Sequence, residues 1–272
     1  MKFLQKLSAR LAITTLSVCA FALQVSWAEI EKDIPYPHDG EDPENRCAVD
    51  IYKPNDAKNA PVVVWFHGGG LYEGKRAIPE ELKNQGFLVV APGYRLHPGV
   101  KSPVYIEDAA AAVAWVFNHI NEHGGDPKKI FLTGHSAGGY LVTMIALDKK
   151  YLAKHSVDSN KLASIIPFSG QVITHFTIRK ERGMEPLQPV IDEMAPLYHV
   201  RPDAPPILIT SGDREKELFG RYEENAYFRR MMKLKGHKDI ELIEIPGTDH
   251  GSMVKPSFPY LLEFVKKHSA DS

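Results

Sequence analysis

The chain has 272 residues, with 33 lysines and arginines against 34 aspartates and glutamates. A chain of this length forms one large domain or two small ones, and its 43% hydrophobic content provides for a folded core, which excludes a disordered or fibrous protein. The formal net charge of −1 leaves no excess of positive charge for phosphate contacts, which argues against a nucleic-acid partner and favours a small or neutral one.

Residues 1–28 have the three-part pattern of a secretory signal peptide. Lys2, Lys6 and Arg10 precede an uncharged apolar run over residues 11–25, and small residues follow it. The run is shorter than the roughly 20 residues that a membrane-spanning helix needs, so we predict cleavage after Ala28 and no stable membrane insertion. The mature protein is then expected in the periplasm or outside the cell.

The cysteine and histidine content predicts neither a disulfide nor a metal site. Cleavage after Ala28 would remove Cys19 and leave Cys47 without a partner for an intrachain disulfide. The histidines are dispersed along the chain, whereas a metal site needs several ligands at close spacing. We therefore expect no metal and no other cofactor.

The mature sequence continues as short apolar runs separated by other patterns. Residues 29–45 are polar and rich in proline, which predicts an extended entry segment with little regular structure, and residues 46–52 alternate as in an edge strand. Further apolar runs are typical of strands buried on both faces of a parallel sheet. These runs are residues 61–66, 86–91, 129–133, 162–168 and 206–210.

Helical patterns lie between several of these runs. Apolar residues recur at helical spacing over residues 106–120 and 222–234. Strands that alternate with helices predict a mostly parallel sheet covered on both faces, with its functional site at the carboxyl ends of the strands. The segment 171–205, with five prolines, is too irregular for a plain crossover. We interpret it as a lid insertion, with a surface excursion without function as the alternative.

The strongest catalytic motif is Gly-His-Ser-Ala-Gly-Gly over residues 134–139, between a predicted strand and an apolar helical stretch. A serine on a strained strand-to-helix turn needs glycines beside it, because the neighbouring chain comes very close. Ser136 would also stand at a helix N-terminus, whose N–H groups favour developing negative charge. A glycine-rich turn with an incidental serine is the alternative, so a second motif is needed.

That second motif is His-Gly-Gly-Gly over residues 67–70, directly after a predicted strand. Consecutive glycines allow backbone N–H groups to point into a site, where each donor stabilises a tetrahedral oxyanion by roughly 3 to 4 kcal/mol. A phosphate-binding loop is the alternative, but the G-x-x-x-x-G-K-[ST] pattern is missing. The two glycine motifs together favour acyl transfer at Ser136.

A serine hydroxyl is a poor nucleophile and needs a base oriented by an acid. His250 stands in a turn after the apolar alternation of residues 240–245, where a loop can bring its ring over Ser136. The chain order serine, acid, histidine places the acid after the strand at 206–210. Asp213 and Glu215 are both available there, and both remain candidates.

These motifs resemble the α/β-hydrolase superfamily, in particular the esterase and lipase-like branch that carries a His-Gly-Gly-Gly motif. Asp50-Ile51-Tyr52, Tyr94-Arg95-Leu96 and Gly125-Asp126-Pro127 also fall in the family's order, so the resemblance covers essentially the whole mature chain. It implies an eight-stranded, mostly parallel sheet with helices on both faces.

The resemblance also implies roles for individual residues. Ser136 would be the nucleophile and His250 the base. The oxyanion hole would consist of the N–H groups of Gly69, Gly70 and Ala137. For the acid, the family's usual spacing favours Glu215, whereas the usual residue type favours Asp213.

We therefore expect a serine carboxylesterase that works through an acyl-enzyme on a small-molecule or polysaccharide-linked ester. The chain looks most like small exported bacterial feruloyl and acetyl-xylan esterases, which implies feruloyl or acetyl groups on plant polysaccharide. An arylformamidase-type amide hydrolase has the same motif order, although secretion argues against that intracellular task. A non-catalytic binding protein of this fold is the alternative from another class, but such proteins lack a triad or oxyanion member, and here every role has a candidate.

Overall fold

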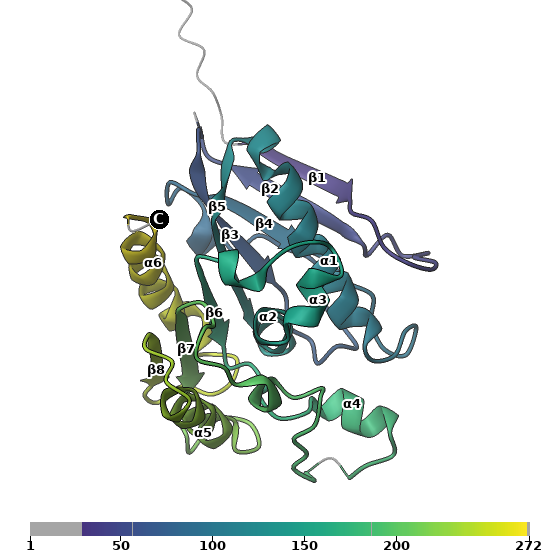
Figure 1. The fold of residues 1–272 in the computed structure, drawn as a ribbon, viewed down its shortest axis with the longest axis vertical. Helices are drawn as coiled ribbons and strands as arrows, with labels where there is room; N and C mark the ends of the chain where they lie inside the picture. Colours follow the sequence, from purple (N-terminus) through teal and green to yellow (C-terminus); the bar gives the residue numbers. More distant parts are fainter. Residues whose placement is uncertain (1–28, 56, 186, 271–272) are drawn as a thin grey trace, which may run out of the picture.

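The computed structural model describes residues 29–55, 57–185 and 187–270, so the predicted signal peptide lies outside the described residues. One eight-stranded sheet runs through the molecule, in the order β1-β2-β4-β3-β5-β6-β7-β8 (Figure 1). The strands are β1 (Glu29–Pro35), β2 (Ala48–Lys53), β3 (Ala60–Phe66), β4 (Leu88–Pro92), β5 (Gly125–His135), β6 (Ser164–Phe168), β7 (Ile207–Gly212) and β8 (Ile240–Ile245). Strands β3 to β8 are mutually parallel, and β2 is antiparallel to both of its neighbours. The expected mostly parallel sheet is confirmed.

The first two strands differ from the sequence-based expectation. The entry segment contains a regular strand, β1, and β2 is not an edge strand because it lies between β1 and β4. The pairing of β1 shifts register between Glu31 and Ile34, and Asp33 has a φ of 57°. A bulge of this kind breaks the alternation of side chains on which a strand prediction depends. The polar, solvent-exposed β1 therefore gave no apolar pattern to detect.

Helices cover both faces of the sheet. They are α1 (Val104–His119), α2 (Ala137–Leu147), α3 (Lys149–Ala153), α4 (Phe176–Glu181), α5 (Arg221–Leu234) and α6 (Val254–Ala270), with short 3-10 helices at η1 (Glu80–Leu82), η2 (Ile120–His123), η3 (Ser159–Lys161) and η4 (Pro196–His199). Buried residues of α1, α2 and α5 share one core cluster, and those of α6 and η1 share the cluster on the other face. Among the described residues, none of the helices combines the length and apolarity needed to cross a bilayer.

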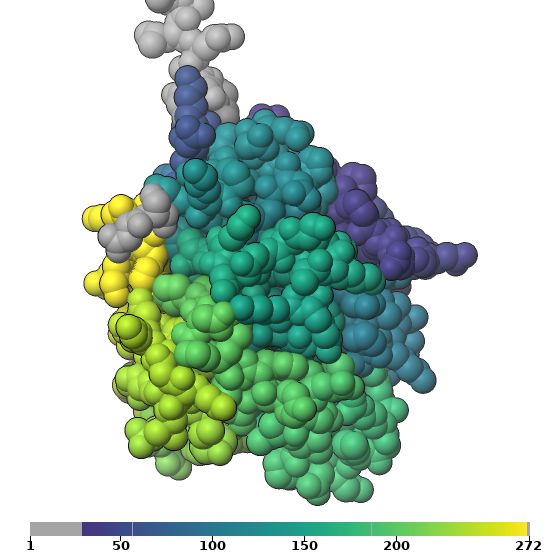
Figure 2. Space-filling model, in the orientation of Figure 1, coloured from purple at the N-terminus to yellow at the C-terminus, as the bar shows by residue number. Residues whose placement is uncertain are grey.

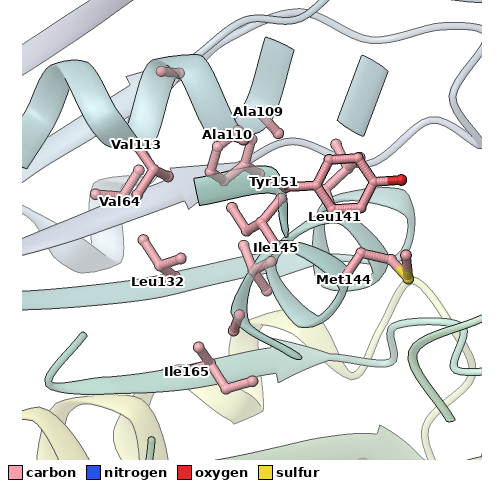
Figure 3. Close-up of a cluster of buried hydrophobic side chains, with 14 of the residues drawn as sticks. Val64, Ala109, Ala110, Val113, Leu132, Leu141, Met144, Ile145, Tyr151 and Ile165 are labelled. Atoms are coloured by element: carbon pink, nitrogen blue, oxygen red, sulfur yellow. The ribbon is translucent and has the colours of Figure 1, made fainter. Parts of the chain in front are cut away.

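The larger core cluster lies between α1, α2 and the central strands (Figure 3). Val64 of β3, Leu132 of β5 and Ile165 of β6 meet Val113 of α1 and Ile145 of α2, and all five side chains are fully buried. Burial of each such side chain contributes about 1.5 to 3 kcal/mol. This packing fixes the carboxyl ends of β3, β5 and β6 relative to one another, which is where the chemical motifs lie.

The segment 171–205 is irregular apart from α4 and η4. It is attached to the body of the molecule by hydrogen bonds from Tyr140 Oη to the Met194 carbonyl, at 2.8 Å, and from Ser102 N to Glu181 Oε2, at 3.0 Å. Figure 2 shows it in green as the lower right part of the surface, against the blue loop that precedes α1. Its function as a lid remains a prediction.

Candidate active site

Ser136 occupies a strained turn between β5 and α2. Its φ of 56° and ψ of −114° lie in a region that L-residues rarely adopt. The turn passes so close to β3 that a Cβ at Gly138 would lie 2.2 Å from the Phe66 carbonyl oxygen, and one at Gly134 would lie 2.6 Å from the same atom. The glycines on either side of Ser136 are therefore required by the approach of two backbones, as the motif predicts.

His250 reaches Ser136 from the loop between β8 and α6. Its Nε2 lies 2.9 Å from Ser136 Oγ, although the two residues are 114 positions apart in the chain. The backbone of this loop is held by His135, whose Nε2 donates to the His250 carbonyl at 2.8 Å. Burial, assisted by the nearby His250, lowers the pKa of His135 to about 4, so the His135 ring is neutral at pH 7 and orients the loop without adding charge.

The carboxylate that faces His250 belongs to Glu217. Its Oε1 lies 2.6 Å from His250 Nδ1, and the side chain is 1% exposed. Oε1 also accepts from Leu218 N at 2.9 Å, and Oε2 accepts from Ser169 Oγ at 2.8 Å and from Gly212 N at 3.0 Å. Burial alone would raise the pKa of Glu217, but these hydrogen bonds outweigh it and lower the pKa to about 2, so Glu217 is ionised at neutral pH.

The structure corrects the expectation for the acid, because neither Asp213 nor Glu215 contacts His250. Asp213 instead accepts hydrogen bonds from Gly247 N at 2.7 Å and from Glu215 N at 3.0 Å, and Glu215 is exposed. The chain forms a turn directly after β7, with Glu217 N donating to the Asp213 carbonyl at 2.8 Å. This turn brings the Glu217 carboxylate to His250 at the end of the sheet. Counting residues from Gly212 does not predict that Glu217 is the residue that faces the ring.

Ser169, at the end of β6, is a further contact that the sequence analysis missed. Its hydroxyl donates to Glu217 and lies 3.1 Å from His250 Nδ1. The residue is fully buried and has a φ of 47°. In the sequence, Ser169 could have been found from its position directly after a predicted buried strand, because the carboxyl end of that strand lies at the same edge of the sheet as Ser136.

The glycine motif that contains two of the residues expected to form the oxyanion hole lies beside Ser136 at its Gly68. Gly69 and Gly70 both have positive φ, 103° and 60°, and a Cβ at Gly68 would lie 3.4 Å from Ser136 Cβ. Within the described ranges, the backbone N–H groups of Gly69, Gly70 and Ala137 donate no turn or loop hydrogen bond to another residue. Because backbone N–H groups need an acceptor, these three donors are available to a bound oxyanion.

One group of side chains has atoms close enough for a metal ion. Ligand atoms of His38, Asp42 and Cys47 lie within 4.8 Å of one another, on the segment between β1 and β2. Burial raises the pKa of the Cys47 thiol to about 12, so this thiol is protonated at neutral pH. None of the three contacts Ser136 or His250, and no step of the chemistry at Ser136 requires them. The expectation that the protein needs no metal remains a prediction.

Residues 49–219 match the model of the BD-FAE family. This chain belongs to the BD-FAE family. The match covers more than half of the chain and includes both Ser136 and Glu217, but it ends before His250.

Two relatives from Mycobacterium tuberculosis (strain ATCC 25618 / H37Rv) are similar to this BD-FAE chain over most of its length. The probable carboxylic ester hydrolase LipM is 28% identical over 247 residues, which cover 79% of this chain and 56% of LipM. Esterase LipC is 28% identical over 241 residues, which cover 78% of this chain and 58% of LipC. The chain thus spans a little over half the length of the curated relatives it matches.

Solved structures share the fold of this BD-FAE protein. A truncated form of a carbohydrate esterase from gut microbiota superposes with a TM-score of 0.73 at 18% identity, over 89% of this chain and 96% of that one. Esterase 2 of Thermogutta terrifontis, phosphoramylated by tabun, superposes with a TM-score of 0.68 at 25% identity, over 90% of this chain and 94% of that one. The expected α/β-hydrolase architecture is therefore confirmed.

Proposed function

We propose that this BD-FAE protein is a serine carboxylesterase. The observation that carries the proposal is the unbroken chain of contacts from Ser136 Oγ to His250 Nε2, at 2.9 Å, and from His250 Nδ1 to Glu217 Oε1, at 2.6 Å. A nucleophile, a base and an ionised acid in this order are what activation of a serine hydroxyl requires. Relatives named as a carboxylic ester hydrolase and as an esterase support ester hydrolysis over other acyl transfers.

The reaction proceeds by two displacements. In the first, Ser136 Oγ attacks the ester carbon while His250 Nε2 takes the serine proton, and the carbonyl oxygen becomes an oxyanion beside the N–H groups of Gly69, Gly70 and Ala137. The imidazolium then gives the proton to the oxygen of the leaving alcohol. The bond between that oxygen and the acyl carbon breaks, the alcohol departs, and the acyl-enzyme remains. In the second, water repeats the attack, the acid product departs, and Ser136 recovers its proton.

The position of Glu217 makes this proton transfer favourable. With a pKa of about 2, the carboxylate stays ionised at pH 7 and faces the ring nitrogen that is protonated throughout the cycle. Its negative charge stabilises the imidazolium, and the short contact holds the ring with Nε2 toward Ser136. Asp213 and Glu215 have no direct part in these steps.

We further propose that the ester is a feruloyl or acetyl group on plant polysaccharide and that the protein acts in the periplasm or outside the cell. The predicted cleavage after Ala28 supports export, and export suits a polymer that does not enter the cytoplasm. A carbohydrate esterase has the same fold, which is compatible with this substrate class. The partner is then the ester-bearing carbohydrate itself.

A fluorophosphonate probe tests the proposal, because it reacts covalently with an activated serine. We expect labelling of the wild type and none of Ser136→Ala, and an unlabelled wild type would instead favour a non-catalytic binding protein. A substrate panel then separates the alternatives. Turnover of methyl ferulate and 4-nitrophenyl acetate, with none of N-formylkynurenine, supports the esterase, whereas the reverse preference supports an arylformamidase-type amide hydrolase.

A further inference from the structure

Ser169, whose hydroxyl donates to Glu217, stands in a backbone conformation that other groups must maintain. Its φ of 47° lies in the left-handed region, which a serine adopts only at a cost in free energy. Its N–H donates to the Thr210 carbonyl of β7 at 2.7 Å, and its own carbonyl accepts from Arg221 Nη1. The direction of the hydroxyl therefore depends on two contacts, one from the sheet and one from α5.

Arg221 is a buried guanidinium group with two specific partners. It is the first residue of α5 and is 2% exposed. Its Nε lies 2.7 Å from Glu224 Oε1, and its Nη1 donates to the Ser169 carbonyl. Burying such a group is costly unless it is paired and hydrogen-bonded, and an apolar residue of similar size often fills a packing role as well or better. An arginine at this position therefore indicates that the Ser169 carbonyl needs a fixed donor.

Glu224 keeps the guanidinium group of Arg221 in one orientation. Its other oxygen, Oε2, accepts from Ile173 N at 3.3 Å, so the carboxyl group is itself anchored to the backbone that follows β6. Burial, with Arg221 and Arg179 nearby, lowers the pKa of His175 well below its ordinary value, so this ring adds no positive charge that would repel the guanidinium group. The donor to the Ser169 carbonyl is thus held from both sides.

Asn225 makes a comparable contact to the next residue of the same turn. It lies one helical turn after Arg221 and is fully buried, and its Nδ2 donates to the Gly170 carbonyl at 2.9 Å. Gly170 packs against the start of α2, where a Cβ on it would lie 2.6 Å from the carbonyl carbon of Gly139. Asn225 therefore holds the turn against α2, whereas Arg221 holds the residue that contacts the acid.

We propose that Arg221 is a positioning residue of the esterase, which orients the triad acid by holding Ser169. The guanidinium group fixes the Ser169 carbonyl, the fixed backbone directs the hydroxyl at Glu217, and the hydroxyl keeps the carboxylate turned toward His250. Within the described part of the chain, the Arg221 side chain has no hydrogen bond to Ser136 or His250, so its effect on the reaction is indirect. This inference rests on the proposed serine esterase function and adds to it a residue of α5.

Arg221→Lys and Arg221→Met test this role in steady-state hydrolysis of 4-nitrophenyl acetate. Methionine removes both contacts of the guanidinium group, and lysine keeps a charge without the planar fork that binds two acceptors. We expect kcat to fall about 20-fold in Arg221→Met and about fivefold in Arg221→Lys, with KM within about twofold of the wild type. Because Glu224 loses its partner in Arg221→Met, that variant can fail to fold, and Arg221→Lys then carries the test alone.

A double-mutant cycle with Ser169→Ala separates positioning from general damage to the fold. If Arg221 acts by directing the Ser169 hydroxyl, its substitution has no further effect once that hydroxyl is gone. We expect Arg221→Lys to lower kcat less than about 1.5-fold in the Ser169→Ala protein, against about fivefold in the wild type. An equal loss in both backgrounds, or a Ser169→Ala protein as active as the wild type, overturns the proposal.

Asn225→Ala is the matched control, because it removes a buried side-chain donor to the neighbouring carbonyl from the same helix. Its effect on kcat should be the same with and without the Ser169 hydroxyl. Coupling to Ser169→Ala as strong as that of Arg221→Lys would show only a loosened turn and would overturn the proposal. A wild type that neither reacts with fluorophosphonate nor turns over ester sinks the esterase and this inference together, whereas a failed cycle in an active enzyme sinks only the inference.

Discussion

Glu217 receives hydrogen bonds from His250, Ser169, Leu218 and Gly212, and this convergence decides its charge. We predict that Glu217→Gln lowers kcat by about 10³- to 10⁴-fold, because the amide neither stabilises the imidazolium nor fixes the correct tautomer. Steady-state kinetics with 4-nitrophenyl acetate measure the loss.

Glu215→Gln is the matched control for that prediction, since it removes an exposed carboxylate from the same loop. It should leave kcat within about twofold of the wild type. Asp213→Asn should lower kcat less than tenfold, because the Asp213 carboxylate accepts hydrogen bonds from Gly247 N and Glu215 N and does not contact His250. A larger loss in Glu215→Gln than in Glu217→Gln would contradict the assignment of the acid.

Ser169 acts on the reaction through Glu217. Removing its hydroxyl with Ser169→Ala takes away one hydrogen bond to a charged group, a contribution of about 1.5 to 3 kcal/mol. We predict a kcat reduced about 10- to 100-fold with KM nearly unchanged, and slower labelling by fluorophosphonate. An unchanged kcat would show that Gly212 and Leu218 suffice to hold the carboxylate.

The candidate site was partly predictable at this scale. Ser136 and the glycines around it form a local strand–turn–helix motif, so their positions follow from sequence alone. His250 could be chosen from its place after the last strand pattern. Glu217 could not, because the turn that begins at Asp213 brings it to His250, and nothing in the sequence distinguished it from Asp213 and Glu215 as the residue facing the ring.

At the scale of elements, α5 is joined to the 171–205 segment through Glu224. Its Oε2 accepts from Ile173 N at 3.3 Å, and Oε1 lies 2.7 Å from Arg221 Nε. Burial raises the pKa of Glu224 to about 7, against the opposing charge of Arg221. The segment is thus attached at a buried carboxyl group that changes charge near neutral pH.

This shift predicts a pH-dependent stability. A carboxyl group whose folded pKa lies above its ordinary value of 4.5 stabilises the fold fully below pH 4.5, and that contribution is lost as the pH rises to about 7. The free energy of unfolding should fall by about 3 kcal/mol relative to Glu224→Gln over this interval. Urea denaturation of both proteins from pH 4.5 to 8 measures the difference, and a difference independent of pH would contradict the shift.

Among the strands, the buried ones are predictable from sequence and the exposed one is not. Buried strands such as β3 and β6 are continuous apolar runs, and their approximate positions follow from composition. The exposed β1 has no such run, and its place is determined by pairing with β2, through contacts such as that of Ile30 with Tyr52. Pairing partners distant in sequence leave no local pattern, so β1 and the interior position of β2 had to come from the structure.

At the scale of the whole molecule, the predicted processing can be tested directly. Protein expressed in a host with an export pathway should have Glu29 as its first residue, since cleavage is predicted after Ala28. Intact mass and N-terminal sequencing of the exported fraction measure this. Recovery of the full-length chain in the membrane fraction would favour an uncleaved anchor.

The two described ends of the chain lie at the same edge of the sheet, opposite Ser136. Glu29 pairs with Lys53 at the end of antiparallel β2, and Lys129, in the first half of β5, donates from Nζ to the Ser269 carbonyl at 2.8 Å (Figure 1). A purification tag, a fused carbohydrate-binding module or a solid support attached at either end would therefore lie at the end of the strands opposite Ser136. Immobilised through such a link, the protein would keep its catalytic face turned toward the solution.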